Sequence, residues 1–283
     1  MIWCDGELLP DEVPLVRAQD RGLLLGDGLF ETLKVSKGRA LFLTKHLARL
    51  QVSGHSLGFQ INRHMLRNGV HELLEAEGAK DGSMRITVTR GPAPRGLSPV
   101  PVAEQMPVVI IAFFAGAAPA ALPDVPDRLI AAPFVRSSGA VSSRYKTLSY
   151  TDNLAAMAFA KDERAADVLF FNERGEVTST TMANIFVRTG IGYMTPPLSA
   201  GILPGITRDV LLEEAAEAGI TIEVRPLKPE DLRDRLLFRT NSLLGVRPAW
   251  FDDRTSSLRP AIDEDDGLLA SLYRLAERRE EGI

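Results

Sequence analysis

The sequence predicts a two-domain protein of mixed α and β structure (α+β or α/β). The chain has 283 residues, of which 45% are hydrophobic, and this length exceeds the usual limit of a single hydrophobic core. β-Branched segments alternate with amphipathic segments in its first part. A proline-rich spacer without periodicity, residues 115–126, separates an expected N-terminal domain (1–114) from a C-terminal domain (127–283).

The N-terminal domain is expected to be a small α/β sandwich. Its expected strands are Ile2–Leu9 (a hairpin turned at Asp5-Gly6), Leu29–Val35, Ala40–Leu43, Met84–Thr89 and Pro107–Phe114. One helix should begin with Thr44 as its N-cap, and a second should run from Asn62 to about Gly78. Three glycines in the segment 20–28 should prevent a helix there.

The strand at 29–35 presents a mixed face. Phe30, Thr32 and Lys34 share that face, because side chains alternate along a strand. An aromatic ring, a hydroxyl and an amine together suit the lining of a pocket. A solvated sheet face explains the same pattern equally well.

The C-terminal domain is predicted to contain more strands than helices. Strands are expected near 128–132, 168–171, 176–180, 185–188, 221–224 and 236–240. Helices are expected after the segment 144–150, at 206–219 and in the tail from Asp263, whose apolar stripe is Leu268, Leu269, Leu272 and Leu275. Residues 190–205 are interpreted as a loop rich in glycine and proline.

Composition excludes several classes of function. The formal net charge is −4 and no segment concentrates Lys and Arg, so we expect no nucleic-acid partner. The single cysteine, Cys4, rules out a disulfide framework, and the four histidines lack neighbouring ligands, so we expect no metal site. The first ten residues do not resemble a signal peptide and no apolar run has membrane-spanning length. We therefore expect a cytoplasmic protein with no membrane partner.

Lys146 is the candidate nucleophile. It lies in the polar segment RYKTLSY, which leads into a helix of small apolar residues. An amine that is held still and partly desolvated there loses its proton more easily. A solvated surface lysine is the alternative, and other features of the chain decide against it.

Three segments are candidates for binding a phosphate. Gly205-Ile206-Thr207 is a glycine turn that enters a helix, where unpaired N–H groups favour an anion. Asn241-Ser242-Leu243 follows a strand and offers backbone and hydroxyl donors, and Arg49 offers a cation. The sequence contains neither GxGxxG nor GxxxxGK[ST], which argues against dinucleotides and nucleoside triphosphates.

Several motifs in a fixed order resemble a known family. They are DRGLLLGDGLFETLKV, HLARL, RGPAPRGL, YKTLSY, GILPGITRD and TNSLLGVRP. Together they resemble the fold-type IV pyridoxal-phosphate (PLP) enzymes, or class IV aminotransferases, which include branched-chain and D-amino-acid aminotransferases and 4-amino-4-deoxychorismate lyase. The resemblance implies a small α/β domain, a larger pseudo-barrel domain, a cofactor between them, a homodimer and a small amino-acid-like substrate.

The resemblance also implies roles for individual residues. Lys146 would form the Schiff base with the cofactor and shuttle the Cα proton, and Tyr150 would lie near the cofactor O3′. The implied phosphate-binding residues are Arg49, Ile206, Thr207 and Ser242, with Leu203 on the ring face. The implied substrate-binding residues are Phe30, Thr32, Lys34 and Arg95, with Arg90 as a weaker candidate for a carboxylate.

Ser179 departs from the family pattern. The family normally has a glutamate at this position, which holds a proton on the pyridine nitrogen, whereas a serine hydroxyl cannot stabilise a pyridinium as a carboxylate does. Glu176 is a poor substitute, because an odd offset along a strand puts it on the opposite face. The cofactor then becomes a weaker electron sink, which should impair transamination more than elimination of a group from Cβ.

Three functions remain open. The motif TNSLLGVRP and Ser179 favour 4-amino-4-deoxychorismate lyase, a folate-pathway enzyme that eliminates pyruvate to give 4-aminobenzoate. An aminotransferase acting on D-amino or branched-chain amino acids uses the same lysine and phosphate site. The missing glutamate also fits a PLP-binding paralogue that does not catalyse.

Overall fold

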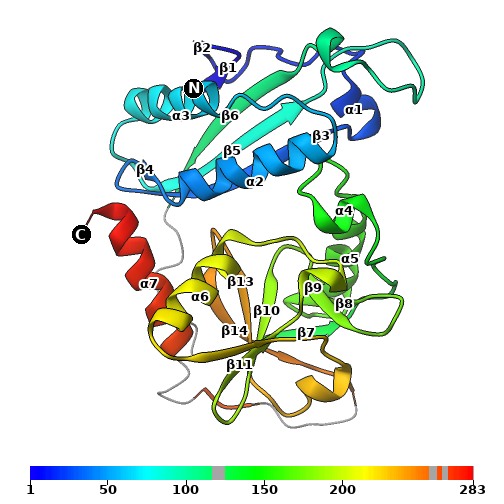
Figure 1. Cartoon of the computed structure of the whole chain (residues 1–283), viewed down its shortest axis with the longest axis vertical. Helices are drawn as coiled ribbons and strands as arrows, with labels where there is room; N and C mark the ends of the chain where they lie inside the picture. The colour runs from blue at the N-terminus through cyan, green and yellow to red at the C-terminus, as the bar shows by residue number, and fades with distance from the viewer. Residues whose placement is uncertain (117–124, 255–259, 263–266, 283) are drawn as a thin grey trace. The chain divides into compact units, whose positions relative to one another are not determined.

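The computed structural model describes residues 1–116, 125–254, 260–262 and 267–282. These residues form two compact units (Figure 1). The first contains the N-terminal part through residue 116, the segment Tyr145–Ser149 and the end of the chain from Glu280, and the second contains the rest of the described residues. The segment that carries Lys146 therefore belongs to the first unit, whereas the sequence assigned it to the second. Most of the expected spacer lies outside the described residues.

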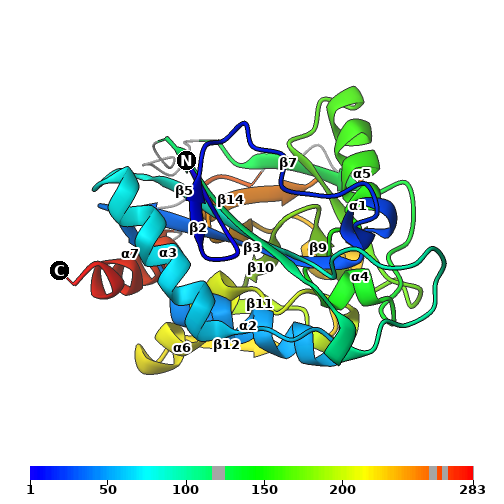
Figure 2. The ribbon, with the colours of Figure 1, turned by 90° about the horizontal axis from the view of Figure 1, so that it is seen from above.

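The first unit is built on a six-stranded sheet in which every pairing is antiparallel. Its strands, in the order β2-β1-β6-β5-β3-β4, are Glu7–Leu9, Ile2–Cys4, Val108–Ala115, Gly82–Thr89, Gly28–Ser36 and Arg39–Ala40. The helices α2 (Leu43–Ser56) and α3 (Arg63–Glu77) pack on one face (Figures 1 and 2). The core between them includes Trp3, Leu33 and Leu47, which are almost fully buried.

The alternation of β3 assigns its side chains to the two faces as expected. Leu33 and Val35 join the core under the helices, while Phe30, Thr32 and Lys34 face the other way. In the register of the sheet these three residues pair with Thr87, Arg85 and Ser83 of β5. The polar face therefore gains an arginine from a strand more than fifty positions away in the sequence.

Three local expectations for this unit are wrong. A one-turn helix, α1 (Arg21–Leu25), does form among the glycines, because Asp20 caps it and Gly26 ends it with a φ of 68°. The strand β4 covers Arg39–Ala40 instead of the expected Ala40–Leu43, and α2 begins at Leu43 after a two-residue turn. Its N-cap position is held by Phe42, and Thr44 instead accepts a hydrogen bond from Arg67.

The second unit is built on an eight-stranded mixed sheet. Its strands, in the order β12-β11-β10-β13-β14-β7-β8-β9, are Thr221–Val224, Gly192–Thr195, Asn184–Arg188, Leu237–Asn241, Gly245–Phe251, Asp127–Ala131, Asp167–Phe171 and Val177–Thr180. Its helices are α4 (Val141–Arg144), α5 (Thr151–Asp162), α6 (Ile206–Glu217) and α7 (Leu268–Glu281, assigned to this unit through residue 279). Three 3₁₀ turns are found in the two units: Val102–Glu104, Leu198–Ala200 and Pro229–Leu232.

The sheet of the second unit curls toward a barrel. Val177 of β9, at one edge, donates its N–H to the carbonyl of Leu227, which lies three residues beyond β12 at the other edge. Apolar side chains from strands all along the sheet fill the interior, among them Leu129, Val187 and Leu237. The helix α5 covers the outside of β7 and β8 through its small residues Ala156 and Ala160. This is the pseudo-barrel that the sequence predicted.

The sequence missed two strands of this barrel. β11 lies within the expected loop at 190–205, and β14 follows the turn at Asn241. Both are flanked by glycine and β14 contains Pro248, so local propensity argues against each of them. The apolar stripe of α7 is also only half correct, since Leu269 and Leu272 are buried whereas Leu268 and Leu275 are exposed.

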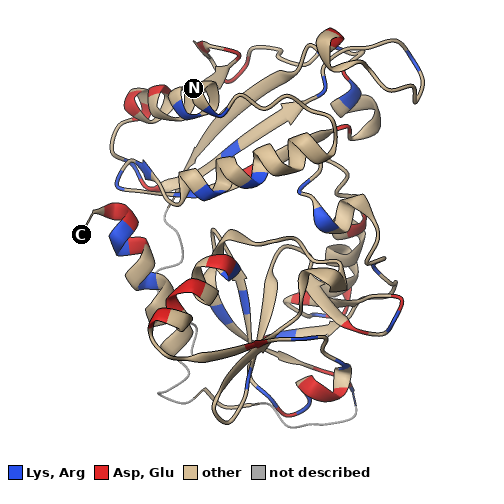
Figure 3. Ribbon diagram, in the orientation of Figure 1, with Lys and Arg blue, Asp and Glu red and all other residues tan. Residues whose placement is uncertain are grey.

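Charge is spread over both units. Figure 3 shows acidic and basic residues interspersed along the ribbon. One ion pair of the second unit joins Arg279 to Glu214 of α6. Among the described residues, none of the helices combines the length and the apolar content that a bilayer-spanning segment needs.

The packing of Trp3 on α3 yields a first test. A Cβ atom at Gly69 would lie 2.6 Å from the indole ring of Trp3, which is only 2% exposed. We expect Gly69→Ala to lower the free energy of unfolding by about 1–3 kcal/mol, measured by urea titration, because the core has no room for the methyl group. Gly190→Ala is the control, because nothing lies within 4 Å of its added Cβ. A Gly69→Ala variant as stable as the control would contradict this packing.

Candidate active site

Lys146 is fixed against the start of β3 in the first unit. Phe30 donates its N–H to the carbonyl of Lys146 at 2.9 Å, and Leu148 donates to the carbonyl of Gly28 at 3.0 Å. These bonds make the lysine segment a short extra strand beside β3. The amine Nζ then lies 4.2 Å from the centroid of the Phe30 ring. Backbone pairing, rather than the helix that follows, therefore holds Lys146 in place.

The surroundings of the amine lower its affinity for a proton. Burial lowers the pKa of Lys146 to about 8; nearby Glu31 opposes this shift, while Arg49 and Arg85 add to it. At neutral pH a useful fraction of the side chain is therefore the uncharged amine. This is the form that attacks a carbonyl carbon and accepts a proton.

A buried polar cluster lies on the helix side of β3. Glu31 is 1% exposed and accepts hydrogen bonds from Nε and Nη2 of Arg49, at 2.8 and 2.5 Å, and contacts Nδ1 of His46 at 2.7 Å. Burial alone would raise the pKa of Glu31, but Arg49 and His46 more than offset this and bring it to about 2. Burial lowers the pKa of His46, and the neighbouring Glu31 opposes this shift. Glu31 is thus a fixed negative charge that orients Arg49.

Arg85 is a candidate that the sequence interpretation missed. Its guanidinium carbon lies 3.7 Å from the centroid of the Phe30 ring, the same ring that Lys146 contacts, and its Nε donates to Thr87. Two cationic groups thus share one aromatic ring. The register of β3 with β5 brings them together, and no local pattern in the sequence indicates that register.

The other expected substrate-binding residues differ in their surroundings. Phe30 is buried, and Thr32 and Lys34 are half-buried on the same face of the sheet. Arg95 is exposed in the loop after β5. Arg90 donates to Asp27 and to the carbonyls of Leu57 and Gly58. Its interpretation as a carboxylate-binding group is therefore corrected: its donors hold the unit together.

In the second unit, the side chains of three asparagines form hydrogen bonds that connect separate segments at one end of the barrel. Asn153 of α5 donates to the carbonyl of Thr181, and Asn241 of β13 donates to that of Met182. Asn184 of β10 donates to the carbonyl of Leu203 at 3.0 Å. The connection between β9 and β10 is thereby tied to α5 and β13, and the first residue of β10 is tied to the segment of Leu203. The expected cofactor-binding residues of this unit all lie on these segments or next to them.

The N-terminus of α6 has the features of an anion site. Its N-cap is Gly205, which supplies no side-chain acceptor for the first N–H groups. A Cβ at Gly205 would lie 1.9 Å from Oδ1 of Asn184, so only glycine fits there. Ile206 and Thr207 follow in the first turn, and the Thr207 hydroxyl lies 3.4 Å from that of Tyr273.

The second expected phosphate-binding segment is only partly as predicted. Oδ1 of Asn241 accepts the N–H groups of Leu243 and Leu244, at 3.0 and 2.7 Å. The N–H of Leu243 is therefore used inside the turn and is not a donor for a ligand. Ser242 is half-buried at the tip of this turn.

Ser179 lies beside an arginine. Nη1 of Arg136 donates to Oγ of Ser179 at 3.2 Å, and Nη2 donates to Oδ1 of Asn153 at 2.6 Å. The guanidinium also stacks on Phe170, 3.7 Å from its centroid. Tyr150, at the N-cap of α5, is close enough to act on Arg136 electrostatically.

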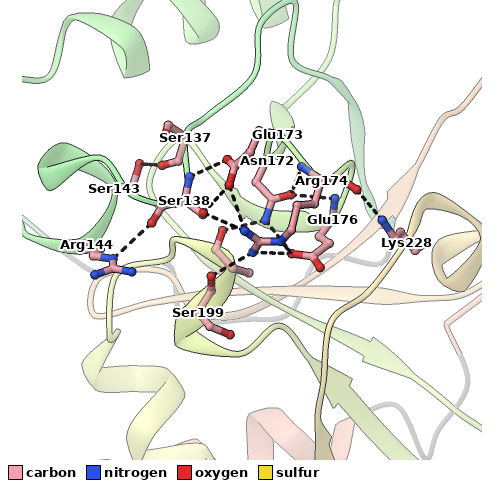
Figure 4. A network of polar contacts seen from close by, with 11 residues as sticks. Ser137, Ser138, Ser143, Arg144, Asn172, Glu173, Arg174, Glu176, Ser199 and Lys228 are labelled. Atoms are coloured by element: carbon pink, nitrogen blue, oxygen red, sulfur yellow. Dashed lines mark hydrogen bonds and ion pairs between the residues drawn. The ribbon is translucent and has the colours of Figure 1, made fainter.

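Glu176 is bound elsewhere, as the sequence suggested. Its carboxylate accepts hydrogen bonds from Asn172 and Arg174, in the turn between β8 and β9 (Figure 4). The same network connects this turn to the segment before Lys146, since both Ser138 groups, its N–H and its hydroxyl, donate to Glu173. Glu176 therefore does not supply the carboxylate that is absent at Ser179.

Comparison with known proteins identifies the family. The model of the family "Amino-transferase class IV" matches residues 28–249. A putative branched-chain-amino-acid aminotransferase of Methanocaldococcus jannaschii is 30% identical over 82% of this chain and 80% of its own. A bifunctional aminodeoxychorismate lyase / D-amino acid transaminase of Mycobacterium tuberculosis is 30% identical over 83% of this chain and 84% of its own.

A solved structure extends the likeness to the whole fold. A hypothetical aminotransferase of Mycobacterium tuberculosis, in a PLP-bound form, has a TM-score of 0.85 and 25% identity, covering 99% of both chains. The two units therefore have the fold of the PLP enzymes of fold type IV. The matched residues include the segments of Lys146, Ser179 and Thr207. The chain belongs to the class IV aminotransferase family.

Proposed function

We propose that this PLP-dependent enzyme is a 4-amino-4-deoxychorismate lyase. Its family uses pyridoxal 5′-phosphate, and a similar solved structure contains that cofactor. The observation that carries the choice of reaction is that Ser179 contacts a cation, Arg136, where the family pattern has a glutamate. The bifunctional relative of Mycobacterium tuberculosis has a lyase activity in its name, which supports the same choice.

The residues present fit the cofactor. The open N-terminus of α6 suits a phosphate, and the absence of a side chain at Gly205 leaves room for the Asn184 amide beside it. We assign the phosphate to Ile206, Thr207, Ser242 and Arg49, and the ring to Leu203, Tyr150 and Ser179. Lys146, with its lowered pKa, is the amine that forms the covalent link.

Lys146 has two roles in the proposed reaction. Its amine would hold the cofactor covalently, and the same amine, once free, would accept the proton from the substrate Cα. When bound, pyridoxal 5′-phosphate withdraws electrons from that carbon and so acidifies the proton. Arg85, Lys34 and Arg95 are the cationic groups that we assign to the substrate carboxylates.

Ser179 bears on what happens after the proton is removed. Transamination needs a second proton delivery, to the C4′ carbon of the cofactor, and this benefits from a strongly electron-withdrawing ring. In elimination, the electron pair instead leaves with the group on the substrate Cβ, which becomes pyruvate. The substrate's own ring then becomes aromatic, as 4-aminobenzoate. A serine paired with an arginine supports the ring charge less than a carboxylate does, so it favours elimination.

An aminotransferase is the second candidate. The relative of Methanocaldococcus jannaschii, at 30% identity, is named a putative branched-chain-amino-acid aminotransferase. The lysine and the anion site serve both reactions equally. The two cationic groups near Phe30 also suit a dicarboxylic acceptor such as 2-oxoglutarate.

The two candidates predict different products. Purified protein loaded with PLP should convert aminodeoxychorismate to equal amounts of 4-aminobenzoate and pyruvate, measured by chromatography. With D-alanine or L-isoleucine and 2-oxoglutarate it should form no glutamate above the level of the Lys146→Ala variant. Glutamate formation without 4-aminobenzoate would support the aminotransferase and contradict the lyase.

Lys146→Ala should abolish both cofactor attachment and turnover. The variant protein should lack the visible absorption band of linked PLP and lose roughly 10³-fold or more of its activity, because no other group replaces the nucleophile and base. Lys161→Ala is the matched control, since this lysine is exposed on α5. A coloured, active Lys146→Ala protein would show that another residue carries the chemistry.

Capture of the cofactor should follow the lowered pKa of Lys146. In the cofactor-free protein, the rate of PLP attachment should rise with pH and level off above a midpoint of about 8, because only the neutral amine attacks. An ordinary lysine would give a midpoint of about 10.4. Arg85→Met should move the midpoint upward, because Arg85 lowers the pKa of Lys146. A wild-type midpoint near the ordinary value would contradict the desolvated amine.

A further inference from the structure

Arg136 is held in place by a backbone hydrogen bond, by stacking on an aromatic ring and by two side-chain hydrogen bonds. Its backbone N–H donates to the carbonyl of Phe171, which continues the edge of β8. Its guanidinium stacks on the Phe170 ring at 3.7 Å and is bound by Asn153 and Ser179. Asn153 is fixed in turn, because its amide donates to the carbonyl of Thr181 at 2.5 Å. The direction of the guanidinium toward Ser179 is therefore imposed by α5, β8 and the turn after β9.

In the part of the chain that the structure describes, no carboxylate forms a hydrogen bond to Ser179 or to the Arg136 guanidinium, where the family pattern has a glutamate. Among the described residues, the hydrogen-bond partners of the Arg136 guanidinium are Ser179 and Asn153. Asp167 of β8 is already bound by Thr181 and Arg239, and Glu176 by Arg174 and Asn172. Burial lowers the pKa of Arg136, while Tyr150, Asp152 and Asp167 raise it, and an arginine stays charged in proteins. The charge next to Ser179 is thus positive.

The hydroxyl of Ser179 has a defined role in this arrangement. An arginine donates hydrogen bonds and accepts none, so Oγ of Ser179 accepts a hydrogen bond from Arg136 and cannot donate its own O–H to Arg136. Its own O–H is left to donate to another acceptor. A pyridine nitrogen without a proton is such an acceptor. A protonated ring nitrogen would instead add a second cationic donor to the same oxygen, beside a like charge.

We propose that Arg136 and Ser179 together keep the ring nitrogen of the bound cofactor unprotonated, with Ser179 donating to that nitrogen and Arg136 acting through Ser179 as a positioning residue. This inference rests on the proposed function, which assigns Ser179 to the ring. On this inference, the serine that replaces the glutamate contributes to keeping the ring nitrogen unprotonated, and is more than a lost interaction. The substrate class that benefits is one with a good leaving group on Cβ, because its reaction needs the weakest electron withdrawal by the ring.

The experiment is a direct measurement of the nitrogen. Wild-type holoenzyme loaded with PLP labelled with ¹⁵N in the ring should give a ring-nitrogen chemical shift in the range of free, unprotonated pyridine across the pH range in which the protein is folded. Ser179→Glu should move the signal to the pyridinium range, because the new carboxylate stabilises the proton. Arg136→Met should let the nitrogen titrate, so that a pyridinium signal appears as the pH is lowered, in a range where wild type shows none.

Two control variants distinguish the effect of the Arg136 charge from an effect of altered packing around Arg136. Arg136→Lys keeps the positive charge and should show the wild-type chemical shift. A loss of structure at this site would instead change Arg136→Lys and Arg136→Met in the same way. Arg233→Met removes an exposed arginine of the same unit and should leave the shift unchanged. A wild-type signal in the pyridinium range, or an Arg136→Met titration identical to wild type, would overturn this inference, whereas the proposed lyase activity is decided separately by whether 4-aminobenzoate and pyruvate are formed. A protein that does not attach PLP at all would refute the proposed function and this inference together.

Discussion

The burial of one amine against a sheet is the constraint on which the candidate chemistry depends. Lys146 is joined to β3 through backbone hydrogen bonds, and its Nζ lies over Phe30. Desolvation then brings its pKa to about 8. Nearby Glu31 raises this pKa, while Arg49 and Arg85 lower it, so its value depends on their combined effect. Without the backbone pairing, a lysine between two helices would be an ordinary solvated side chain.

In the second unit, side-chain hydrogen bonds make the segments around the candidate anion site rigid. Asparagine side chains bind backbone carbonyls at the turn between β9 and β10, and Gly205 allows close approach at the start of α6. Hydrogen bonds from these amides favour one geometry of the turn, since a rearrangement would break them. An anion site made of backbone N–H groups needs such rigidity, because it has no side chain that adjusts to the ligand.

The lyase proposal and the inference about Arg136 concern the same question of charge at the cofactor ring. A carboxylate at Ser179 would strengthen electron withdrawal, and a cation there weakens it. The family fold accommodates both arrangements, because the position lies on a strand whose backbone is fixed by the barrel whatever its side chain is. On the proposed assignment, the residue at position 179 separates two reactions that would share their nucleophile and their phosphate site.

The sequence by itself determined the two-unit α and β architecture, most strands and helices, and the identity of Lys146 as the candidate nucleophile. These follow from periodicity and from motifs, which are local. Only the tertiary structure decided that Lys146 belongs with the first unit, that Arg85 joins it on Phe30, that Arg90 is an internal anchor and that Arg136 faces Ser179. Each of these depends on strand register or on contacts between distant segments. Such contacts are set by packing of the whole unit, and no short stretch of sequence encodes them.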